Sequence, residues 1–521
     1  MVVDPTLARD INVAWALDGY PAVAGWPEVA FRKACAKRYP STMTASDRQF
    51  PEPAPERRVF ANRTLKMRSI RAVGYDMDYT LTQYKAEAFE EFAFSHASGL
   101  LAELGWPVGA LSFDAASTAR GLVVDQDLGN LVKATRFGWV VRARHGSRFL
   151  DHDEVRRTYL GTQIDLSEDR YVLLNSLFSL SEASLFAQGV ELLDAGRLPG
   201  GMGYRDMFAA VVDSVDRIHR DGTLKKGVLA DPGRFISLDG DIVASLLDQR
   251  VSGKLLMLIT NSEWSYTNKI MTHTFDPFLR GGDKWRDLFE IVVVSSAKPG
   301  FFTSSNPLYR VVDEERGLLE PHFGPLGSGG VFYGGSAQLL EESLGLIGDE
   351  ILYVGDHLYG DVHYSKALRR WRTALILQEL EAEIRALAEF KPTQTRLTEL
   401  VDQRQRLEAQ LGAQRLAQLR AAEGHADPLG PTEGHLASIA ETEAELSQLN
   451  ELMAPLKDEA SRLQNQGWGT LTRAKQDKSL FFRQIERYAD IYTSRVSNLL
   501  FPGPYATFRM GRLALPHDPP S

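Results

Sequence analysis

The chain has 521 residues, with 59 basic and 68 acidic side chains and a formal net charge of −9. Apolar residues make up 44% and charged residues 24%, which is near the average for globular proteins and excludes a disordered, collagen-like or membrane-embedded chain. The acidic balance argues against a protein that binds nucleic acid through bulk charge. At roughly 150 residues per domain, the length leaves room for about three domains.

The N-terminal residues 1–57 include a proline-rich stretch at 51–55 and no sustained periodicity, so we expect an arm there. The start of the chain lacks a basic segment followed by an apolar one. No apolar run approaches the ~18 residues of a membrane span. A single cysteine, Cys35, fits a reducing compartment. We therefore expect a cytoplasmic protein that does not bind membranes.

Four short apolar runs predict strands, and each of them ends at a polar residue. They occupy residues 71–75, 254–260, 291–294 and 351–354. Continuous apolar runs of this length are typical of strands buried on both faces of a parallel sheet. Because helical patterns separate them, the sequence predicts an α/β fold, a parallel sheet flanked by helices, with its ligands at the carboxyl ends of the strands.

The first two strands are separated by far more chain than the dozen or so residues that a parallel crossover needs. We therefore expect a core formed by residues 58–84 and 226–380, with an inserted, mainly helical cap over 85–225. We expect residues 466–521 to be a helical segment that packs back on the core.

The segment 381–465 is rich in Leu, Glu, Gln, Arg and Ala and predicts an antiparallel, coiled-coil-like helical hairpin. A seven-residue pattern connects Leu397, Leu400, Leu407 and Leu411, and a second one connects Leu446, Leu449, Met453, Leu456 and Leu463. A breaker-rich stretch at 424–431 separates the two arms. Pro455 is expected to kink or break the second arm.

Two pairs of acids follow predicted strands. Asp76 and Asp78 are two residues apart and can face one pocket, while Asp356 and Asp361 follow another strand. Acids at such positions also serve as helix caps and turn formers. Four carboxylates at one sheet edge would repel each other without a cation. Hard oxygen ligands without a His or Cys cluster indicate Mg²⁺.

Two further strand ends complete the set. Thr260, Asn261 and Ser262 offer hydroxyl and amide groups, and Lys298 offers a positive charge. A cation, a lysine and a hydroxyl around an aspartate suit a phosphoryl group, whose oxygens need neutralising in the transition state. Carboxylates can act as nucleophiles in such sites.

The order of these motifs along the chain resembles that of the haloacid dehalogenase superfamily, which has a Rossmann-like core. The order is D-x-D-x-T, a strand-end Thr, a Lys and G-D-x-x-x-x-D. Further segments resemble the cytosolic purine 5′-nucleotidase family, whose substrates are of the IMP and GMP type. The resemblance covers about 58–380 and 466–516, and the matching segments are 59–64, 74–81, 120–123, 129–133, 260–262, 266–271, 355–357 and 487–492.

The resemblance implies a role for each acid. Asp76 would attack phosphorus, and Asp78 would protonate the leaving ribose oxygen and later activate water. Asp76, Asp356 and the backbone carbonyl of Asp78 would hold Mg²⁺, with Asp361 supporting them. Thr260, Asn261, Ser262 and Lys298 would hold the phosphoryl oxygens.

In the cap, the resemblance makes Phe178 the platform for the base, although a core phenylalanine is an equally good interpretation. Asp216, His219 and Lys225 match positions on the base and phosphate side of the site. Asp216 and His219 are three residues apart and share a helix face. Two positions depart from the purine pattern, because Val212 replaces an arginine that reads the base and Arg220 replaces an aromatic residue. Purine preference is therefore in doubt.

The family also has an activating site for nucleotide polyphosphates, whose contacts match Asn175, Gln484 and Tyr488. Its basic residues align with Asp165 and Ala367, so we expect no activation by ATP-like effectors.

The favoured hypothesis is a Mg²⁺-dependent 5′-nucleotidase that acts on nucleoside 5′-monophosphates, purine-type first, through an aspartyl-phosphate. A nucleoside phosphotransferase and a phosphatase for another phosphate monoester are alternatives. A non-catalytic scaffold that acts through the hairpin is the alternative from another class. By analogy with the family we expect a homo-oligomer, either a dimer or a tetramer.

Overall fold

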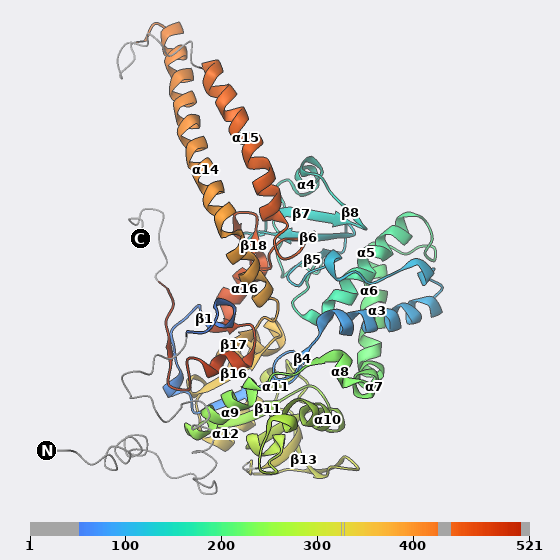
Figure 1. The fold of residues 1–521 in the computed structure, drawn as a ribbon. Coiled ribbons are helices and arrows are strands. Elements are labelled where there is room, and N and C mark those ends of the chain that lie inside the picture. Colours follow the sequence, from blue (N-terminus) through green and yellow to red (C-terminus); the bar gives the residue numbers. More distant parts are fainter. Residues whose placement is uncertain (1–51, 325, 328, 426–438, 512–521) are drawn as a thin grey trace, which may run out of the picture.

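The computed structural model describes residues 52–324, 326–327, 329–425 and 439–511 (Figure 1). Cys35 and most of the predicted arm lie outside these ranges. The last part of that arm is ordered against the protein: Pro55–Arg57 forms a 3-10 turn, and the Arg57 side chain bonds to Asn498 and Ser497.

The centre of the molecule is a ten-stranded sheet. Its middle strands are parallel, and antiparallel strands complete both edges. In spatial order the strands are β1 (Phe60–Ala61), β20 (Ile491–Thr493), β17 (Arg372–Ile376), β16 (Ile351–Gly355), β3 (Ala72–Tyr75), β11 (Leu255–Ile259), β12 (Ile291–Val294), β15 (Gly330–Gly334), β13 (Leu308–Asp313) and β14 (Leu318–Pro321).

All four predicted strands are present, as β3, β11, β12 and β16. Their side chains alternate between the two faces of the sheet, so each face has its own core. Val73 and Leu258 pack in the cluster that includes α9 (Asp241–Val251) and α10 (Trp264–Phe275). Ile259 and Tyr353 pack in the cluster on the other face, which includes α11 (Gly300–Thr303) and α12 (Ala337–Leu344). Helices on both faces explain why these strands are continuously apolar.

The insertion that follows strand β3 is helical in part, as expected. Its helices are α3 (Ala86–Glu103), α4 (His152–Tyr159), α5 (Leu180–Asp194), α6 (Tyr204–Arg220) and α7 (Thr223–Ala230). It also contains a five-stranded antiparallel sheet that the sequence did not predict. Its strands are β5 (Val123–Asp125), β6 (Asn130–Ala134), β7 (Val140–His145), β8 (Arg148–Phe149) and β9 (Tyr171–Leu173). Most of these strands are too short to show a period in the sequence.

The two chain crossings between the core and this insertion lie side by side. β4 (Gln83–Tyr84) leaves the core and pairs antiparallel with β10 (Ile236–Ser237), which follows α8 (Pro232–Phe235) on the way back. The chain therefore enters and leaves the insertion along one two-stranded connection.

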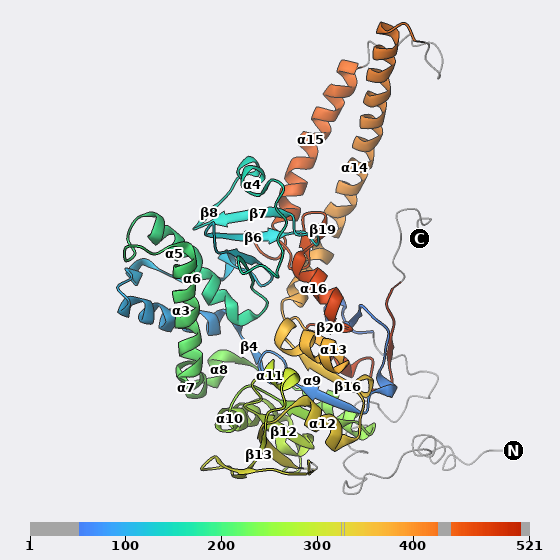
Figure 2. The same ribbon diagram turned by 180° about the vertical axis from the view of Figure 1, so that it is seen from behind.

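The predicted helical hairpin is formed by α14 (Leu380–Ala422) and α15 (Ile439–Ser461), which pack along each other and project from the rest of the molecule (Figures 1 and 2). Leu400 and Met453 of the two heptad patterns are buried. Of the kink or break expected at Pro455, the break is wrong, because α15 continues through this residue to Ser461. Proline has no backbone N–H, so one helical hydrogen bond is missing in the last third of α15, and packing against α14 offsets that loss.

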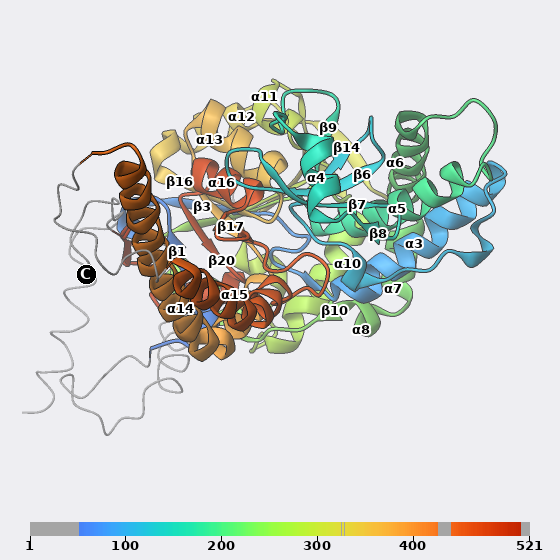
Figure 3. The ribbon, with the colours of Figure 1, turned by 90° about the horizontal axis from the view of Figure 1, so that it is seen from above.

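The segment after the hairpin is only partly helical, which corrects the prediction for 466–521. α16 (Leu480–Tyr488) is flanked by the short pair β18 (Arg473–Ala474) and β19 (Asp477–Lys478), and then β20 enters the main sheet beside β17. Further on, β21 (Thr507–Phe508) pairs with β2 (Leu65–Lys66). Seen from above, the hairpin and the cap helices α3 and α5 lie towards opposite sides of the molecule (Figure 3).

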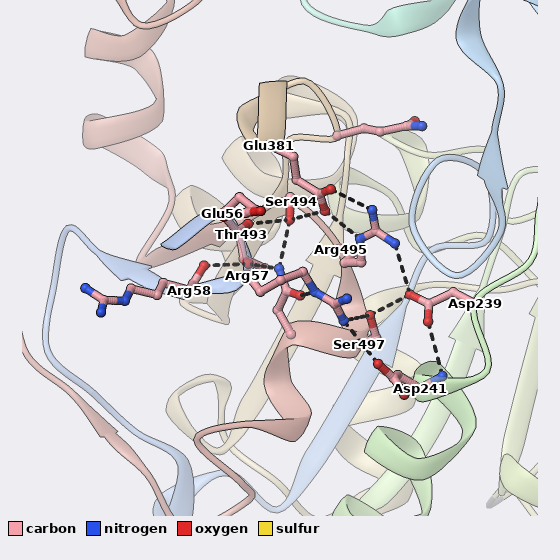
Figure 4. Close-up of polar contacts among 12 residues, drawn as sticks. Glu56, Arg57, Arg58, Asp239, Asp241, Glu381, Thr493, Ser494, Arg495 and Ser497 are labelled. Atoms are coloured by element: carbon pink, nitrogen blue, oxygen red, sulfur yellow. Dashed lines mark hydrogen bonds and ion pairs between the residues drawn. The ribbon is translucent and has the colours of Figure 1, made fainter. Parts of the chain in front are cut away.

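A polar network fastens the start of the hairpin to the core (Figure 4). Glu381 accepts from Arg495 at 2.6 and 2.8 Å and from the hydroxyl of Ser494 at 2.8 Å. Asp239, just before α9, accepts from the hydroxyl of Ser497 at 2.6 Å and from Arg495 at 3.5 Å. The network joins α14, the segment after β20 and the loop before α9.

Candidate active site

The polar residues singled out in the sequence follow adjacent strands and meet at one edge of the sheet. Asp76 follows β3, and its backbone N–H donates to the carbonyl of Val354 in β16 at 2.9 Å. Thr260 follows β11, and its N–H donates to Val293 in β12, also at 2.9 Å. The parallel register therefore carries the loops after β16, β3, β11 and β12 to the same place.

Lys298 lies between two of the carboxylates. Its Nζ is 2.7 Å from Asp76 Oδ1 and 2.7 Å from Asp361 Oδ1, and it donates to the hydroxyl of Tyr353 at 3.0 Å. Only 4% of the Lys298 side chain is exposed. A lysine buried this deeply needs charged partners, and the two aspartates supply them.

The electrostatics of this group follow from burial and from mutual repulsion. Burial raises the pKa of Asp76 to about 7, opposed by the positive charge of Lys298 and reinforced by the charges of Asp361 and Asp78. The pKa of Asp356 is raised well above its usual range by burial and then by the charges of Asp361 and Asp76. Burial by itself lowers the pKa of Lys298, but the charges of Asp361 and Asp76 outweigh this effect and hold the pKa well above its usual range.

Asp76, Asp356 and Asp361 each offer a carboxylate oxygen, and these oxygens lie within 4.8 Å of one another. Asp356 Oδ2 is buried and has no hydrogen-bond partner among the described residues. A divalent cation bound here would supply the missing partner of Asp356 Oδ2. It would also relieve the repulsion between carboxylates, which contributes to their raised pKa values. The donor set therefore fits a hard cation such as Mg²⁺.

Asp78 lies beside this group in a different environment. Its Oδ1 accepts from the hydroxyl of Tyr84 at 2.7 Å and its Oδ2 accepts from Ser262 Oγ at 3.1 Å. The Tyr84 hydroxyl is also 2.9 Å from that of Tyr266. Burial raises the pKa of Asp78, against the lowering effect of these two hydrogen bonds and of Lys225. A carboxyl group in this environment is suited to proton transfer.

The loop after β11 is connected to the loop that carries Lys298. The carboxamide of Asn261 accepts from the Lys298 N–H at 2.7 Å and donates to the Lys298 carbonyl at 3.1 Å. Ser296 Oγ donates to the Thr260 carbonyl at 2.9 Å. Asn261, predicted to bind substrate, thus also holds Lys298 in place. Ser295 and Ala297 of this loop have positive φ angles of 47° and 55°, the kind of backbone strain that occurs at functional sites.

The cap residues are brought together less tightly. Phe178 is half-buried, with its ring centroid 4.7 Å from that of Tyr79, 5.3 Å from Phe89 and 5.5 Å from His219. Burial lowers the pKa of His219 to about 4, so this imidazole is neutral at physiological pH.

The two remaining cap residues are more accessible. Asp216 is exposed, although its charge raises the pKa of His219. Lys225 pairs with Glu263 and lies 5.3 Å from the centroid of the Tyr266 ring. The cap therefore contributes an aromatic wall and a cation near Asp78.

Three residues that contact the site were given no role in it by the sequence analysis, although one of them, Arg120, begins the family-matching segment 120–123. Tyr84 reaches Asp78, Tyr353 reaches Lys298, and Arg120 donates to the carbonyl of Asp356 at 3.4 Å. A tyrosine within the apolar run 351–354 was the one signal available for Tyr353. The contacts of Tyr84 and Arg120 with the site join segments that are distant in the chain, so local pattern does not predict them.

The fold and the site together define an α/β protein with a parallel sheet, a cap inserted after strand β3, and acids at the ends of neighbouring strands. A sequence profile of the 5′ nucleotidase family matches residues 59–520, so the chain belongs to that family. It is thereby a phosphoric monoester hydrolase.

The chain is 28% identical to human 5′-nucleotidase domain-containing protein 2 over 482 residues, which is 89% of this chain and 85% of the relative. The protein of the same name from Rattus norvegicus is also 28% identical, over 89% of this chain and 80% of that one.

Two solved structures are distantly similar. A haloacid dehalogenase-like family hydrolase from Xanthomonas campestris has 14% identity and a TM-score of 0.23, over 59% of this chain and 82% of that one. CbbY from Rhodobacter sphaeroides, in complex with phosphate, has 13% identity and a TM-score of 0.22, over 59% and 86% of the two chains.

Within the part of the chain that the structure describes, no helix is both long and apolar enough to cross a membrane.

Proposed function

We propose that this protein is a Mg²⁺-dependent 5′-nucleotidase that converts nucleoside 5′-monophosphates, purine-type first, into nucleoside and phosphate. The observation that carries the proposal is the buried cluster of Asp76, Asp356, Asp361 and Lys298 with Asp78 beside it. This arrangement supports a mechanism in which one carboxylate attacks phosphorus and a second one transfers a proton.

In the first step, Asp76 attacks phosphorus and forms an aspartyl-phosphate, while the bond from phosphorus to the ribose oxygen breaks. Asp78 gives its proton to that oxygen, for which its raised pKa is suitable. In the second step, Asp78 takes a proton from water, the water oxygen bonds to phosphorus, and the bond to Asp76 breaks.

Asp76, Asp356 and the backbone carbonyl of Asp78 would hold the Mg²⁺ ion, with Asp361 supporting them, and the bound ion would neutralise charge on the phosphoryl oxygens. Thr260, Ser262 and Lys298 would bind the same oxygens. Tyr84 and Ser262 orient the Asp78 carboxyl group by hydrogen bonds from both sides.

For the nucleoside, we propose that Phe178 and His219 form the wall against which the base stacks, with Asp216 and Lys225 nearby. Val212 on α6 offers no hydrogen-bond donor, and a site that lacks such a donor discriminates weakly between bases. A panel of nucleoside and sugar monophosphates, assayed with Mg²⁺, measures this preference. Addition of inosine to the same assay detects phosphotransfer as a new nucleotide.

Asp76→Asn tests the mechanism. We expect turnover to fall by at least ~10³-fold, because the amide cannot form the aspartyl-phosphate, while circular dichroism shows an unchanged fold. Asp349→Asn, an exposed aspartate before β16, is the matched control and should retain full activity. Normal turnover in Asp76→Asn would refute the mechanism.

A further inference from the structure

Arg120 is a buried arginine to which the proposed mechanism assigns no role. It lies in the loop before β5 of the cap, and its side chain is 0% exposed. Its Nη2 donates to Glu379 Oε2 at 2.8 Å, its Nη1 donates to the backbone carbonyl of Asp356 at 3.4 Å, and its guanidinium lies 5.6 Å from the centroid of the Phe481 ring. One side chain thus joins the cap, the loop after β16, the start of the hairpin and α16.

Both ends of the hairpin meet at this place. Glu379 directly precedes α14, and its carbonyl accepts from Gln464 Nε2, after α15, at 3.0 Å. Asn465 Nδ2 donates to the carbonyl of Thr118 at 3.0 Å, and Trp468 Nε1 donates to that of Ser117 at 2.9 Å. The cap segment 117–120 is therefore held by both ends of the hairpin, and its last residue reaches the loop of Asp356.

From these contacts we propose that Arg120 is a positioning residue, which holds the Asp356 loop in place relative to the base of the hairpin. The inference rests on the proposed function in one respect, the Mg²⁺ site at Asp356. The two Nη groups of Arg120 have acceptors, whereas its Nε is buried with no hydrogen-bond partner among the described residues. The planar fork of a guanidinium reaches two acceptors in fixed directions. Residues that orient metal ligands typically change metal affinity 10–100-fold when they are replaced.

The direction in which Mg²⁺ affinity changes when Arg120 is replaced distinguishes a positioning role from a purely electrostatic one. The positive charge of Arg120 repels a cation at Asp356, so its removal strengthens Mg²⁺ binding if charge is all that matters. If Arg120 positions the loop, the neutral variant binds Mg²⁺ more weakly. Arg120→Lys keeps the charge but loses the two-pronged donor, so it also binds more weakly.

The test is Mg²⁺ binding to the full chain, measured by isothermal titration calorimetry without substrate. We expect Arg120→Gln and Arg120→Lys to bind roughly 10–100-fold more weakly than wild type, with folding checked by circular dichroism. If Arg120→Gln does not fold, Arg120→Lys alone decides. Arg144→Lys is the matched control, because Arg144 donates to the Ser117 carbonyl of the same segment at 2.7 Å but, among the described residues, makes no hydrogen bond to the Asp356 loop.

Wild-type affinity or tighter binding in folded Arg120→Lys overturns the inference, whether or not the enzyme hydrolyses nucleotides. Failure of wild-type protein to bind Mg²⁺ overturns both the inference and the metal dependence of the proposed function. Mg²⁺ binding without nucleotidase activity overturns the proposed function alone.

Glu379→Gln tests the connection to the hairpin. We expect it to weaken Mg²⁺ binding in the same direction, because the Arg120 guanidinium loses its ionic partner. If both residues act through one contact, the loss in Arg120→Lys/Glu379→Gln falls well short of the product of the two single losses. Losses that multiply would overturn the connection to the hairpin.

Discussion

Individual residues of the site are held by neighbours that leave little room for change. Gly355 ends β16 directly before Asp356, and a Cβ atom at this position would overlap the side chain of Asp361. Asp361 is the partner of Lys298, and its Oδ2 accepts from the His357 N–H at 3.1 Å. A methyl group at Gly355 would therefore displace the acid that holds the lysine.

We expect Gly355→Ala to lower kcat/KM about 10–100-fold, the range for residues that support site ligands. Steady-state kinetics on a nucleoside monophosphate measure this effect. Gly99→Ala is the control, because position 99 is exposed on α3 with no neighbour within 4 Å of an added Cβ. It should leave kcat/KM unchanged and stabilise the helix by about 0.5–1 kcal/mol. Unchanged kinetics in Gly355→Ala would show that Asp361 can move without consequence.

A second residue-scale prediction concerns Glu90, which is fully buried in α3. Its Oε2 accepts from the Ser181 N–H at 2.8 Å, and burial raises its pKa from an ordinary value of 4.5 to about 8. Because the pKa is higher in the folded state, the stability contributed by the protonated group is complete below about pH 4.5 and is lost as pH rises through about 8.

We therefore expect the melting temperature to fall between pH 6 and pH 9, and to fall less in Glu90→Gln, which stays neutral. Thermal denaturation followed by circular dichroism measures both proteins. Glu87→Gln, an exposed glutamate on the same helix, should keep the wild-type pH dependence. An equal slope in Glu90→Gln and wild type would mean that Glu90 is not the group responsible.

At the scale of elements, the hairpin depends on its base. Glu381, in the first turn of α14, is buried and pairs with Arg495, whereas Glu399 further along the same helix makes an exposed pair with Arg396. Removal of one partner of a buried pair leaves an uncompensated charge, while exposed pairs contribute little.

Glu381→Ala should lower the free energy of unfolding by about 3 kcal/mol, whereas Glu399→Ala should change it by less than about 0.5 kcal/mol. Urea denaturation of the two variants and wild type gives both values. Similar small changes in the two variants would mean that the network of Figure 4 does not stabilise the hairpin base.

The element scale also explains why the cap differs from expectation. Its helices α3 and α6 each contain a buried stripe, which periodicity can reveal, whereas α5 is buried on most sides. Strands such as β5 and β9 have three residues and find their partners across turns and intervening segments. Pairing of this kind depends on tertiary contacts rather than on local pattern.

At the scale of the whole molecule, the residues that match an effector site come from separate elements. Asn175 follows β9, and Gln484 and Tyr488 lie on α16. The Tyr488 ring centroid is 4.2 Å from that of His363. Asp165 is exposed and accepts from the Ser167 hydroxyl at 2.8 Å.

We expect millimolar ATP to leave the hydrolysis rate unchanged, because a carboxylate at position 165 repels a triphosphate and Ala367 offers no positive charge. Rates with and without ATP, at constant free Mg²⁺, test this expectation. Asp165→Arg is an informative companion variant, since a response to ATP that appears only there would attribute the loss of activation to this residue. Several-fold activation of the wild-type protein would contradict the prediction.

The sequence by itself determined the features that local pattern encodes. Apolar runs that end at Asp76, Thr260 and Asp356 specify buried strands with polar ends, because a parallel sheet between helix layers needs such strands. Heptads of leucine specify the hairpin, because only one helix face meets the partner. The ordered motifs placed the chain among phosphohydrolases.

Only the tertiary structure decided how those groups meet. Lys298 lies between Asp76 and Asp361, and Arg120 of the cap reaches Asp356. Strand β20, which follows the hairpin in the sequence, pairs with β17 in the main sheet. Each of these contacts joins segments that are distant in the chain. Side chains at such contacts show no periodic pattern in the sequence. Their partners are a charge or a carbonyl group that comes close only after folding, so the neighbouring residues in the sequence do not indicate the contact.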